Sequence, residues 1–369
     1  MSMSLLLNQS SKLLCFRRKR PVLVRSSPLL SGSFSPTSLQ TPPCNVIDAD
    51  PCFDGADLGK LVISNANEVC FTDLEKKVPM ELVDNPMAVI GSSHGWIATL
   101  REDGILRLQD DLNPHASYTD PKRIPLPPLV TLPHCQTQIV TNVSMSSSSP
   151  EDEDCVVAVK FLGPQLSLCR PAQSNSEWIN IRIANPCFFS SRVMFSERHG
   201  KFSILGAGGH IIASWDLHTH KQNPKFKRLR FRNLPKLTKT KRELMDSCYK
   251  SEHLVESRTT GETFLVKWYR KAVWRGMSKL ITKAFMVFRL DDKGNAVYTQ
   301  DIGDLCIFLS KSEPFCVSLS SFPGMAYPNQ VDYLDVGESG FFDLADNSIV
   351  GGNDSVGTGL YVPPQNIDN

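Results

Sequence analysis

Apolar residues in the middle of the chain fall in short runs that end at glycine-containing turns. Between residues 90 and 310 five pairs of such runs can be identified, and each run has the length of a β-strand. The pairs are 96–101 with 105–108, 193–196 with 201–205, 201–205 with 210–215, 254–257 with 262–269, and 285–290 with 296–300. Glycine tolerates the positive φ of a tight hairpin turn. The pattern predicts an all-β body of repeated antiparallel hairpins.

Several of these predicted strands, such as 156–159 and 264–266, are apolar at every position. A sheet with one face in water would show polar residues at alternate positions, so these strands are expected to be covered on both faces. About 320 residues follow the N-terminal segment described below, too many for one sandwich of about 100 residues. At about 40–50 residues per four-stranded blade they suit a β-propeller of six blades, with seven as the alternative. The propeller is predicted over 48–350, with a polar, disordered tail over 351–369.

Residues 1–47 contain six basic residues and ten serines but no Asp or Glu. This composition is typical of an organellar transit peptide and its linker. The dense arginine cluster favours the mitochondrion, with the chloroplast as the alternative. A disordered basic tail that contacts nucleic acid is the competing interpretation. Without these residues the chain has 34 basic and 38 acidic residues, so the body is not globally basic.

The rest of the sequence offers few signs of chemistry. Eleven cysteines show no C-x-x-C spacing, which favours free thiols in a reducing compartment. No apolar run reaches the ~18–20 residues of a membrane span. The glycine loop at 206–210 precedes a strand-like run and not a helix, so it is interpreted as a turn. His218 and His220 are interpreted as structural or surface residues, because no acidic or Cys ligand except Asp216 is near them. No catalytic, metal or cofactor motif is found, and a non-catalytic protein without cofactors is expected.

The most unusual segment runs from residue 221 to 242 and holds ten basic residues and no acidic ones. It is interleaved with Phe226, Leu229, Phe231 and Leu234, and aromatic neighbours could stack on nucleic-acid bases. The favoured interpretation is a solvated excursion between blades, and the alternative is a surface that binds anions, RNA or a protein partner. The candidate residues are Lys225, Lys227, Arg228, Arg230, Arg232 and Lys236. Two further expectations are a rigid connector between blades at Pro125–Pro128 and a short helix near 240–249.

An ordered set of motifs over about 50–345 resembles the plant KIB-type β-propellers, which carry the domain of unknown function 295. The motifs are Gly91-Ser-Ser-His-Gly-Trp96, Ile124-Pro-Leu-Pro-Pro-Leu129, His253-Leu-Val-Glu-Ser257, Gly261, Phe264-Leu-Val266, Ala284-Phe-Met-Val-Phe-Arg-Leu290, Asp301-Ile-Gly-Asp304, Cys306-Ile-Phe-Leu309 and Pro323-Gly324. Many relatives add an N-terminal F-box, a helical module that recruits a ubiquitin ligase core. Nothing in residues 48–90 is similar to one, so the chain resembles the organellar branch that lacks it.

The resemblance implies a propeller without established catalytic residues. Together with the leader, it leads to the expectation of a mitochondrial scaffold that binds an unknown protein partner. The alternatives are an RNA-associated organellar factor that uses residues 221–242, and a relative of the F-box substrate receptors of ubiquitin ligases.

Overall fold

The computed structural model describes residues 40–366 except for 53–56, 66–70, 86–87, 102, 134–138, 217–222, 276, 323–326, 336 and 352–356. Residues 1–39 of the predicted transit peptide, His218, His220 and the Pro323-Gly324 motif lie outside the described residues. Within the described ranges, no helix is both long enough and apolar enough to cross a membrane.

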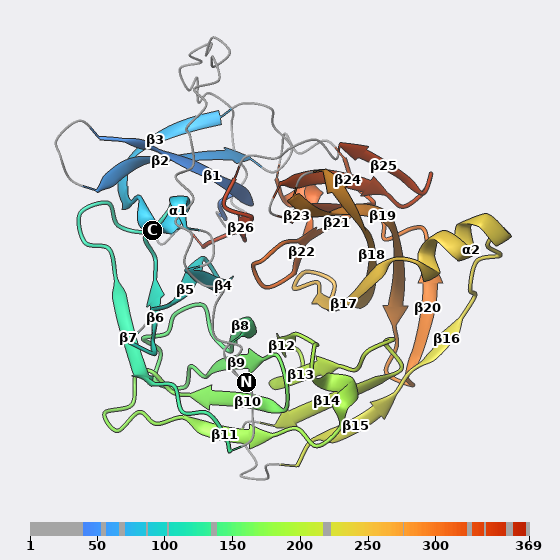
Figure 1. Ribbon diagram of the computed structural model, residues 1–369, viewed down its shortest axis with the longest axis horizontal. Helices are drawn as coiled ribbons and strands as arrows, with labels where there is room; N and C mark the ends of the chain where they lie inside the picture. Colours follow the sequence, from blue (N-terminus) through green and yellow to red (C-terminus); the bar gives the residue numbers. More distant parts are fainter. Residues whose placement is uncertain are drawn as a thin grey trace, which may run out of the picture. The chain divides into compact units, whose positions relative to one another are not determined.

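Six sheets stand around a common axis, and they are called blades 1 to 6 here (Figure 1). From the axis outward, blade 1 is β26 (Leu360–Val362), β1 (Cys44–Pro51), β2 (Leu58–Asn65) and β3 (Phe71–Pro79); blade 2 is β4 (Val89–Ser93), β5 (Trp96–Leu100), β6 (Ile105–Gln109) and β7 (Arg123–Pro128); blade 3 is β8 (Val140–Met145), β9 (Val157–Phe161), β10 (Gln165–Cys169) and β11 (Ile179–Arg182).

The other three blades follow in chain order. Blade 4 is β12 (Val193–Ser196), β13 (Lys201–Leu205), β14 (Ile211–Asp216) and β15 (Lys225–Arg228); blade 5 is β17 (Tyr249–Glu256), β18 (Thr263–Arg275), β19 (Met277–Leu290), β20 (Asn295–Thr299) and β16 (Arg230–Arg232); blade 6 is β22 (Phe315–Ser318), β21 (Leu305–Leu309), β23 (Gln330–Asp335), β24 (Glu338–Asp343) and β25 (Ser348–Gly351). The short helices are α1 (Glu81–Asp84), α2 (Lys239–Asp246) and the 3₁₀ turns Pro186–Phe188 and Leu319–Ser321. The predicted six-bladed propeller is therefore confirmed.

Among the described residues the hydrophobic core consists of six clusters, each formed largely between neighbouring blades. One cluster joins Val157 and Val159 of blade 3 to Ala98 and Leu106 of blade 2. The strand residue between those two valines, Ala158, belongs to the cluster that blade 3 shares with blade 4. The side chains of successive strand residues point to opposite faces, and in a ring both faces meet a neighbour. This arrangement explains why the middle strands are apolar at every position.

The ring is closed by pairing the two ends of the described chain. β26 pairs antiparallel with β1, with Cys44 opposite Val362 and Val46 opposite Leu360. The Thr358 hydroxyl donates to the Val46 carbonyl over 2.8 Å, which fixes the approach to this strand. The propeller thus extends on both sides of the predicted limits of 48 and 350. Part of the polar tail expected over 351–369 is an ordered inner strand.

Three local features refine the expectations. The predicted hairpins are present, and Gly208 and Gly209 form the turn between β13 and β14 with φ of +81° and +75°. The predicted connector Pro125–Pro128 is instead part of β7, an outermost strand on which missing amide donors are tolerated. The predicted helix is α2, which begins after Thr238, whose hydroxyl accepts from the Lys241 amide over 3.2 Å.

Candidate functional site

Residues 310–313, called the axial segment here, connect β21 to β22 and contact four blades besides their own. The hydroxyls of Ser312 and Ser92 lie 2.7 Å apart, and Ser312 also donates to the Tyr361 carbonyl over 2.8 Å. Arg192, just before β12, donates from Nη1 to the Ser310 carbonyl over 2.9 Å. Contacts with blades 1, 2 and 4 place this segment across the axis of the ring.

Glu313 ends the axial segment and accepts hydrogen bonds from blades 2, 3 and 4. Its carboxylate oxygens lie 2.5 Å from the hydroxyls of Ser93 and Ser144, and the Phe195 amide donates over 3.3 Å. Burial raises the pKa of Glu313 to about 6, although these hydrogen bonds and the charge of Arg258 act in the opposite direction. The serine hydroxyls thus keep a carboxylate largely ionised in an enclosed position.

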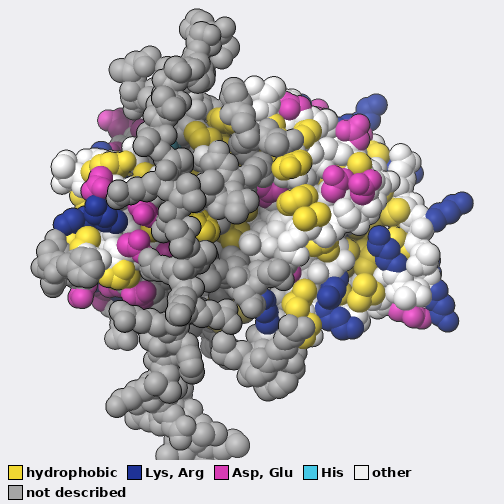
Figure 2. Space-filling view, turned by 90° about the horizontal axis from the view of Figure 1, so that it is seen from above, with side chains coloured by type: hydrophobic (Ala, Val, Ile, Leu, Met, Phe, Trp, Pro, Cys, Tyr) yellow, Lys and Arg dark blue, Asp and Glu magenta, His cyan; other side chains and the backbone are white. Residues whose placement is uncertain are grey.

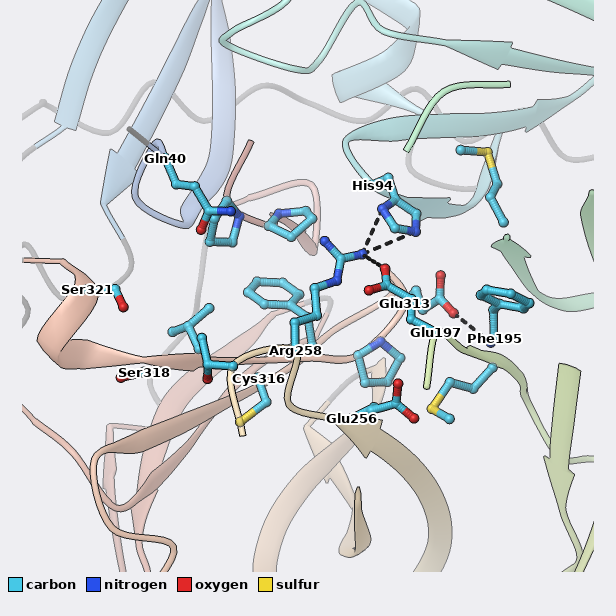
Figure 3. Close-up of a pocket in the computed structure, with 18 of the residues that line it drawn as sticks. Gln40, His94, Phe195, Glu197, Glu256, Arg258, Glu313, Cys316, Ser318 and Ser321 are labelled. Atoms are coloured by element: carbon cyan, nitrogen blue, oxygen red, sulfur yellow. Dashed lines mark hydrogen bonds and ion pairs between the residues drawn. The ribbon is translucent and has the colours of Figure 1, made fainter. Parts of the chain in front are cut away.

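A cavity of about 290 Å³ opens beside Glu313, at the end of the axis where the inner strands finish (Figure 3). Its apolar wall includes Met145, Met194, Phe195, Phe315 and Phe322, and its polar wall includes His94, Glu197, Glu256, Arg258 and Glu313. Glu313 belongs to the axial segment, and the other side chains come from β4, β8, β12, β17 and β22 or the turns that follow them. We call this cavity the axial pocket. Three carboxylates against one guanidinium give it a negative balance.

Arg258 connects two sides of the axial pocket. Its guanidinium forms an ion pair with Glu197 at 2.7 Å and donates to Nδ1 of His94 over 2.9 Å (Figure 3). Burial, followed by the charge of Arg258, lowers the pKa of His94 to about 3. The imidazole is therefore neutral, so Nδ1 can accept from a guanidinium. His94 adopts a φ of +53° beside Gly95, which turns β4 into β5.

The polar groups of the pocket do not have the arrangement of a nucleophilic triad. The Ser196 hydroxyl donates to the Glu256 carboxylate over 2.5 Å and lies 3.0 Å from Nδ1 of His199. In a serine nucleophile the hydroxyl donates to the histidine, which acts as the base. Burial also raises the pKa of the Cys316 thiol well above its usual range, which suppresses the reactive thiolate. The geometry suits recognition of a polar group beside an apolar one.

The basic segment predicted as a binding surface lies on the outer rim, away from the axis. Lys225, Lys227 and Arg228 are in the edge strand β15, and Arg230 and Arg232 are in β16, which crosses to the edge of blade 5. All six candidate residues, Lys236 included, are exposed. Figure 2 shows Lys and Arg side chains at the right-hand end of the molecule, where α2, β16 and β20 lie in Figure 1.

The structure thus brings these cations together on neighbouring edge strands. Their position also explains them without a ligand. A row of charged side chains on an edge strand discourages pairing with another chain. Leu229, between the two strands, is 3% exposed and packs in the cluster between blades 4 and 5. The Lys227 ammonium donates to the Asp291 carbonyl over 3.0 Å, which ties β15 to the turn before β20.

The sequence interpretation missed the axial pocket. The sequence interpretation includes His94 only as part of the motif Gly91-Ser-Ser-His-Gly-Trp96, and it does not single out Arg258 or Glu313. These residues are far apart along the chain, and only the ring closure brings them together. A signal was present in the run Ser310-Lys-Ser-Glu313, which interrupts two apolar strands with four polar residues.

Comparison with known proteins gives the family. Among solved structures the chain is similar to the Cps50 (Swd1) β-propeller domain of Myceliophteria thermophila, with 8% identity, TM-score 0.35, and coverage of 85% of this chain and 87% of that one. It is also similar to a putative 6-phosphogluconolactonase (BF1038) of Bacteroides fragilis, with 9% identity, TM-score 0.38, and coverage of 90% and 100%. The N-terminal domain of Nup159 gives 9% identity, TM-score 0.34, and coverage of 85% and 77%.

No curated protein matches the chain. The family model described as KIB1-4 beta-propeller matches residues 65–358, which is most of the chain and includes the axial segment, His94 and Arg258. The chain belongs to the KIB1-4 β-propeller family.

Proposed function

We propose that this protein is a non-catalytic, mitochondrial interaction scaffold whose axial pocket binds an extended segment of a protein partner. The observation that carries the proposal is the composition of the pocket wall, in which Met194 and Phe195 lie beside Glu197, Glu256 and Glu313. A side chain with an apolar stem and a cationic end complements such a wall. The partner segment is therefore one that presents lysine or arginine next to an apolar residue.

The charges of the pocket favour a cation over an anion. Arg258 is already paired with Glu197, so its charge is largely balanced. Glu256 accepts from the Ser196 hydroxyl and from the Arg198 amide over 3.0 Å, contacts that keep its carboxylate in place without neutralising it. A fixed, uncompensated carboxylate at a partly enclosed site attracts a cationic side chain more strongly than an exposed one does.

Selection of displayed random peptides on the full-length protein tests the binding proposal. Selected peptides should contain lysine or arginine beside an apolar residue. In calorimetry, Glu256→Gln should weaken the binding of these peptides by about tenfold, the equivalent of about 1.4 kcal/mol. Arg228→Gln on the rim is the matched control and should leave affinity unchanged. Selection of acidic peptides, or equal losses in both variants, would contradict the proposal.

The mitochondrial location is supported by the composition of residues 1–47, and a reporter fused to this segment tests it separately. Import of the reporter into mitochondria is expected, and a reporter that stays in the cytosol argues against it. Import into chloroplasts would support the alternative organelle.

The exposed cations of β15 and β16 support a second candidate function, that of an RNA-associated factor. Their continuity across two blade edges gives a basic stretch long enough to follow several phosphates. The third candidate, an F-box type receptor, has less support, because the described parts of 48–90 form β1 to β3, the single-turn helix α1 and the start of β4. Proximity labelling in isolated mitochondria with and without RNase separates the three: resistant neighbours favour the scaffold, RNase-sensitive ones the RNA factor, and ligase subunits the receptor.

A further inference from the structure

At the opposite end of the axis, where the inner strands begin, three cationic side chains from three blades converge. Arg192 immediately precedes β12, Lys311 is in the axial segment, and Arg270 in β18 lies opposite the first residue of β17. Burial is the main cause that lowers the pKa of both Arg192 and Lys311. The charge of Arg270 lowers the pKa of Arg192 further, and the charge of Arg192 lowers the pKa of Lys311 further. The carboxylate of Asp335, at the end of β23, acts in the opposite direction and raises the pKa of both Arg192 and Lys311.

Contacts with the surrounding strands hold the two guanidinium groups in place. Arg270 forms an ion pair with Asp335, and its guanidinium carbon lies 4.3 Å from the centroid of the Trp268 ring. Arg192 is held by its hydrogen bond to the Ser310 carbonyl. Among the groups named here the cluster has three cations and one carboxylate, and the side chains of Arg270 and Asp335 are 18% and 37% exposed, so an anion from solution can reach a positively charged site.

Two nitrogen atoms in this cluster are buried without a hydrogen-bond partner among the described residues. They are Nε of Arg270 and Nδ1 of His253, and His253 as a whole is 4% exposed. Nε2 of His253 lies 3.1 Å from the Ser251 hydroxyl, so Nδ1 carries the proton when Nε2 accepts from that hydroxyl. Burial, followed by the charges of Arg192 and Arg270, lowers the pKa of His253 well below its usual value, so this imidazole is neutral. Buried donors of this kind are almost always satisfied in proteins, by water or by a ligand.

From these observations we infer that Arg192, Arg270, Lys311 and His253 form a binding site for the phosphate group of a small molecule. A phosphate monoester carries a charge of about −1.5 to −2 at pH 7, which offsets positive charge, and it offers several acceptor oxygens to the unpaired N–H donors. Planar guanidinium groups suit the tetrahedral oxyanion, because they can donate two parallel hydrogen bonds. The inference is independent of the proposed partner segment, since the axial pocket lies at the other end of the axis.

Calorimetric titration of the full-length protein with inorganic phosphate and with glycerol 3-phosphate, at constant ionic strength, tests this inference. Binding of either probe is expected, with chloride as the ionic control. Tighter binding of glycerol 3-phosphate identifies a phosphorylated metabolite as the ligand class, and tighter binding of inorganic phosphate identifies the free ion. Absence of binding by both probes at millimolar concentration would overturn the inference.

Variants locate the binding on the cluster. Lys311→Gln should weaken phosphate binding by about tenfold or more, because one of three cations is lost from a partly enclosed site. Arg270→Lys keeps the charge but loses the planar pair of donors, and an intermediate loss is expected. Lys293→Gln, in the exposed turn before β20, is the matched control, and the midpoint of thermal unfolding without phosphate shows which variants remain folded. Wild-type affinity in Lys311→Gln, or equal losses in Lys293→Gln and Lys311→Gln, would place the binding elsewhere and refute the site.

Discussion

The ammonium of Lys160 lies 2.9 Å from the carbonyl oxygen of Phe189, which joins a buried strand of blade 3 to the chain that leads into blade 4. Lys160 is fully buried and donates as well to the carbonyls of Phe161 and Gly163. Lys76 of β3 has the same role between blades 1 and 2, because its ammonium donates to the carbonyls of Asp110, Asn113 and Ala116. Two buried lysines thus connect successive blades through backbone oxygens.

Replacing Lys160 with methionine should destabilise the protein. Burial lowers the pKa of Lys160 to about 7, and the substitution leaves three carbonyls without this donor. We expect the free energy of unfolding at pH 9.5 to fall by about 2–4 kcal/mol. Chemical denaturation measures the change, and Lys225→Met on the exposed rim, with no expected effect, is the control.

The same substitution should change the pH dependence of stability. The folded pKa of Lys160 lies below the unfolded value, so the unfolded chain binds more protons between about pH 7 and 10. The contribution of Lys160 to the free energy of unfolding is therefore fully present above the pKa that this residue has in the unfolded chain, and it is lost as the pH falls towards 7. Wild-type stability should rise with pH in this window, and Lys160→Met should show a smaller rise. An identical slope in both proteins would refute this account.

Glu313 should give a pH dependence of the opposite sign. Its pKa in the folded protein is raised to about 6. The contribution of Glu313 to stability is therefore fully present below its pKa in the unfolded chain, and it is lost as the pH rises through 6. Glu313→Gln removes the buried charge, and the Ser93 and Ser144 hydroxyls can reorient towards the amide. Relative to wild type, the variant should gain up to about 2 kcal/mol between pH 4.5 and pH 8.

Urea denaturation at the two pH values measures the effect of Glu313→Gln. Ser144→Ala is the companion variant. Ser144→Ala removes a hydrogen bond that lowers the pKa of Glu313. It should therefore make the loss of stability with rising pH steeper, whereas Glu313→Gln should abolish this loss. A constant difference between Glu313→Gln and wild type at all pH values would contradict the prediction.

The closing strand β26 should contribute strongly to stability. The Tyr361 ring packs 5.2 Å from that of Phe308, and its backbone oxygen accepts from Ser312 of the axial segment. Tyr361→Ala should cost about 3–5 kcal/mol, the usual range for loss of a large buried aromatic side chain. The substitution Val350→Ala, at a half-exposed position in the outermost strand of blade 6, is the control and should cost less than about 1 kcal/mol.

Charge reversal on the rim tests the RNA-associated alternative. Replacing Lys227, Arg228, Arg230 and Arg232 with glutamate should abolish crosslinking to RNA in organelle extracts if that function is real, because phosphate contacts supply most of such binding. The fold should persist, since all four side chains are exposed. Unchanged crosslinking would remove this candidate, and far-ultraviolet circular dichroism confirms that the variant is folded.

The sequence predicts blades 2, 4 and 5 best, because their hairpins turn at glycines such as Gly104, Gly200 and Gly261, all with positive φ. Blade 6 is harder to predict, since β21 pairs parallel with β23 and the two are not joined by a hairpin turn. β26 is only three residues long, and no periodicity can identify so short a strand. The axial pocket could not be predicted, because His94, Arg258 and Glu313 approach one another only in the closed ring.

The pairing of β26 with β1 sets an order of events for a newly made chain. Residues 44–46 are translated well before their partner strand, residues 360–362. Until then the inner edge of the first blade has unpaired backbone groups. Residues up to 362 must be available before β26 can pair with β1 and close the ring. A fusion partner placed close behind residue 366 would therefore interfere with maturation far more than one attached at the opposite terminus.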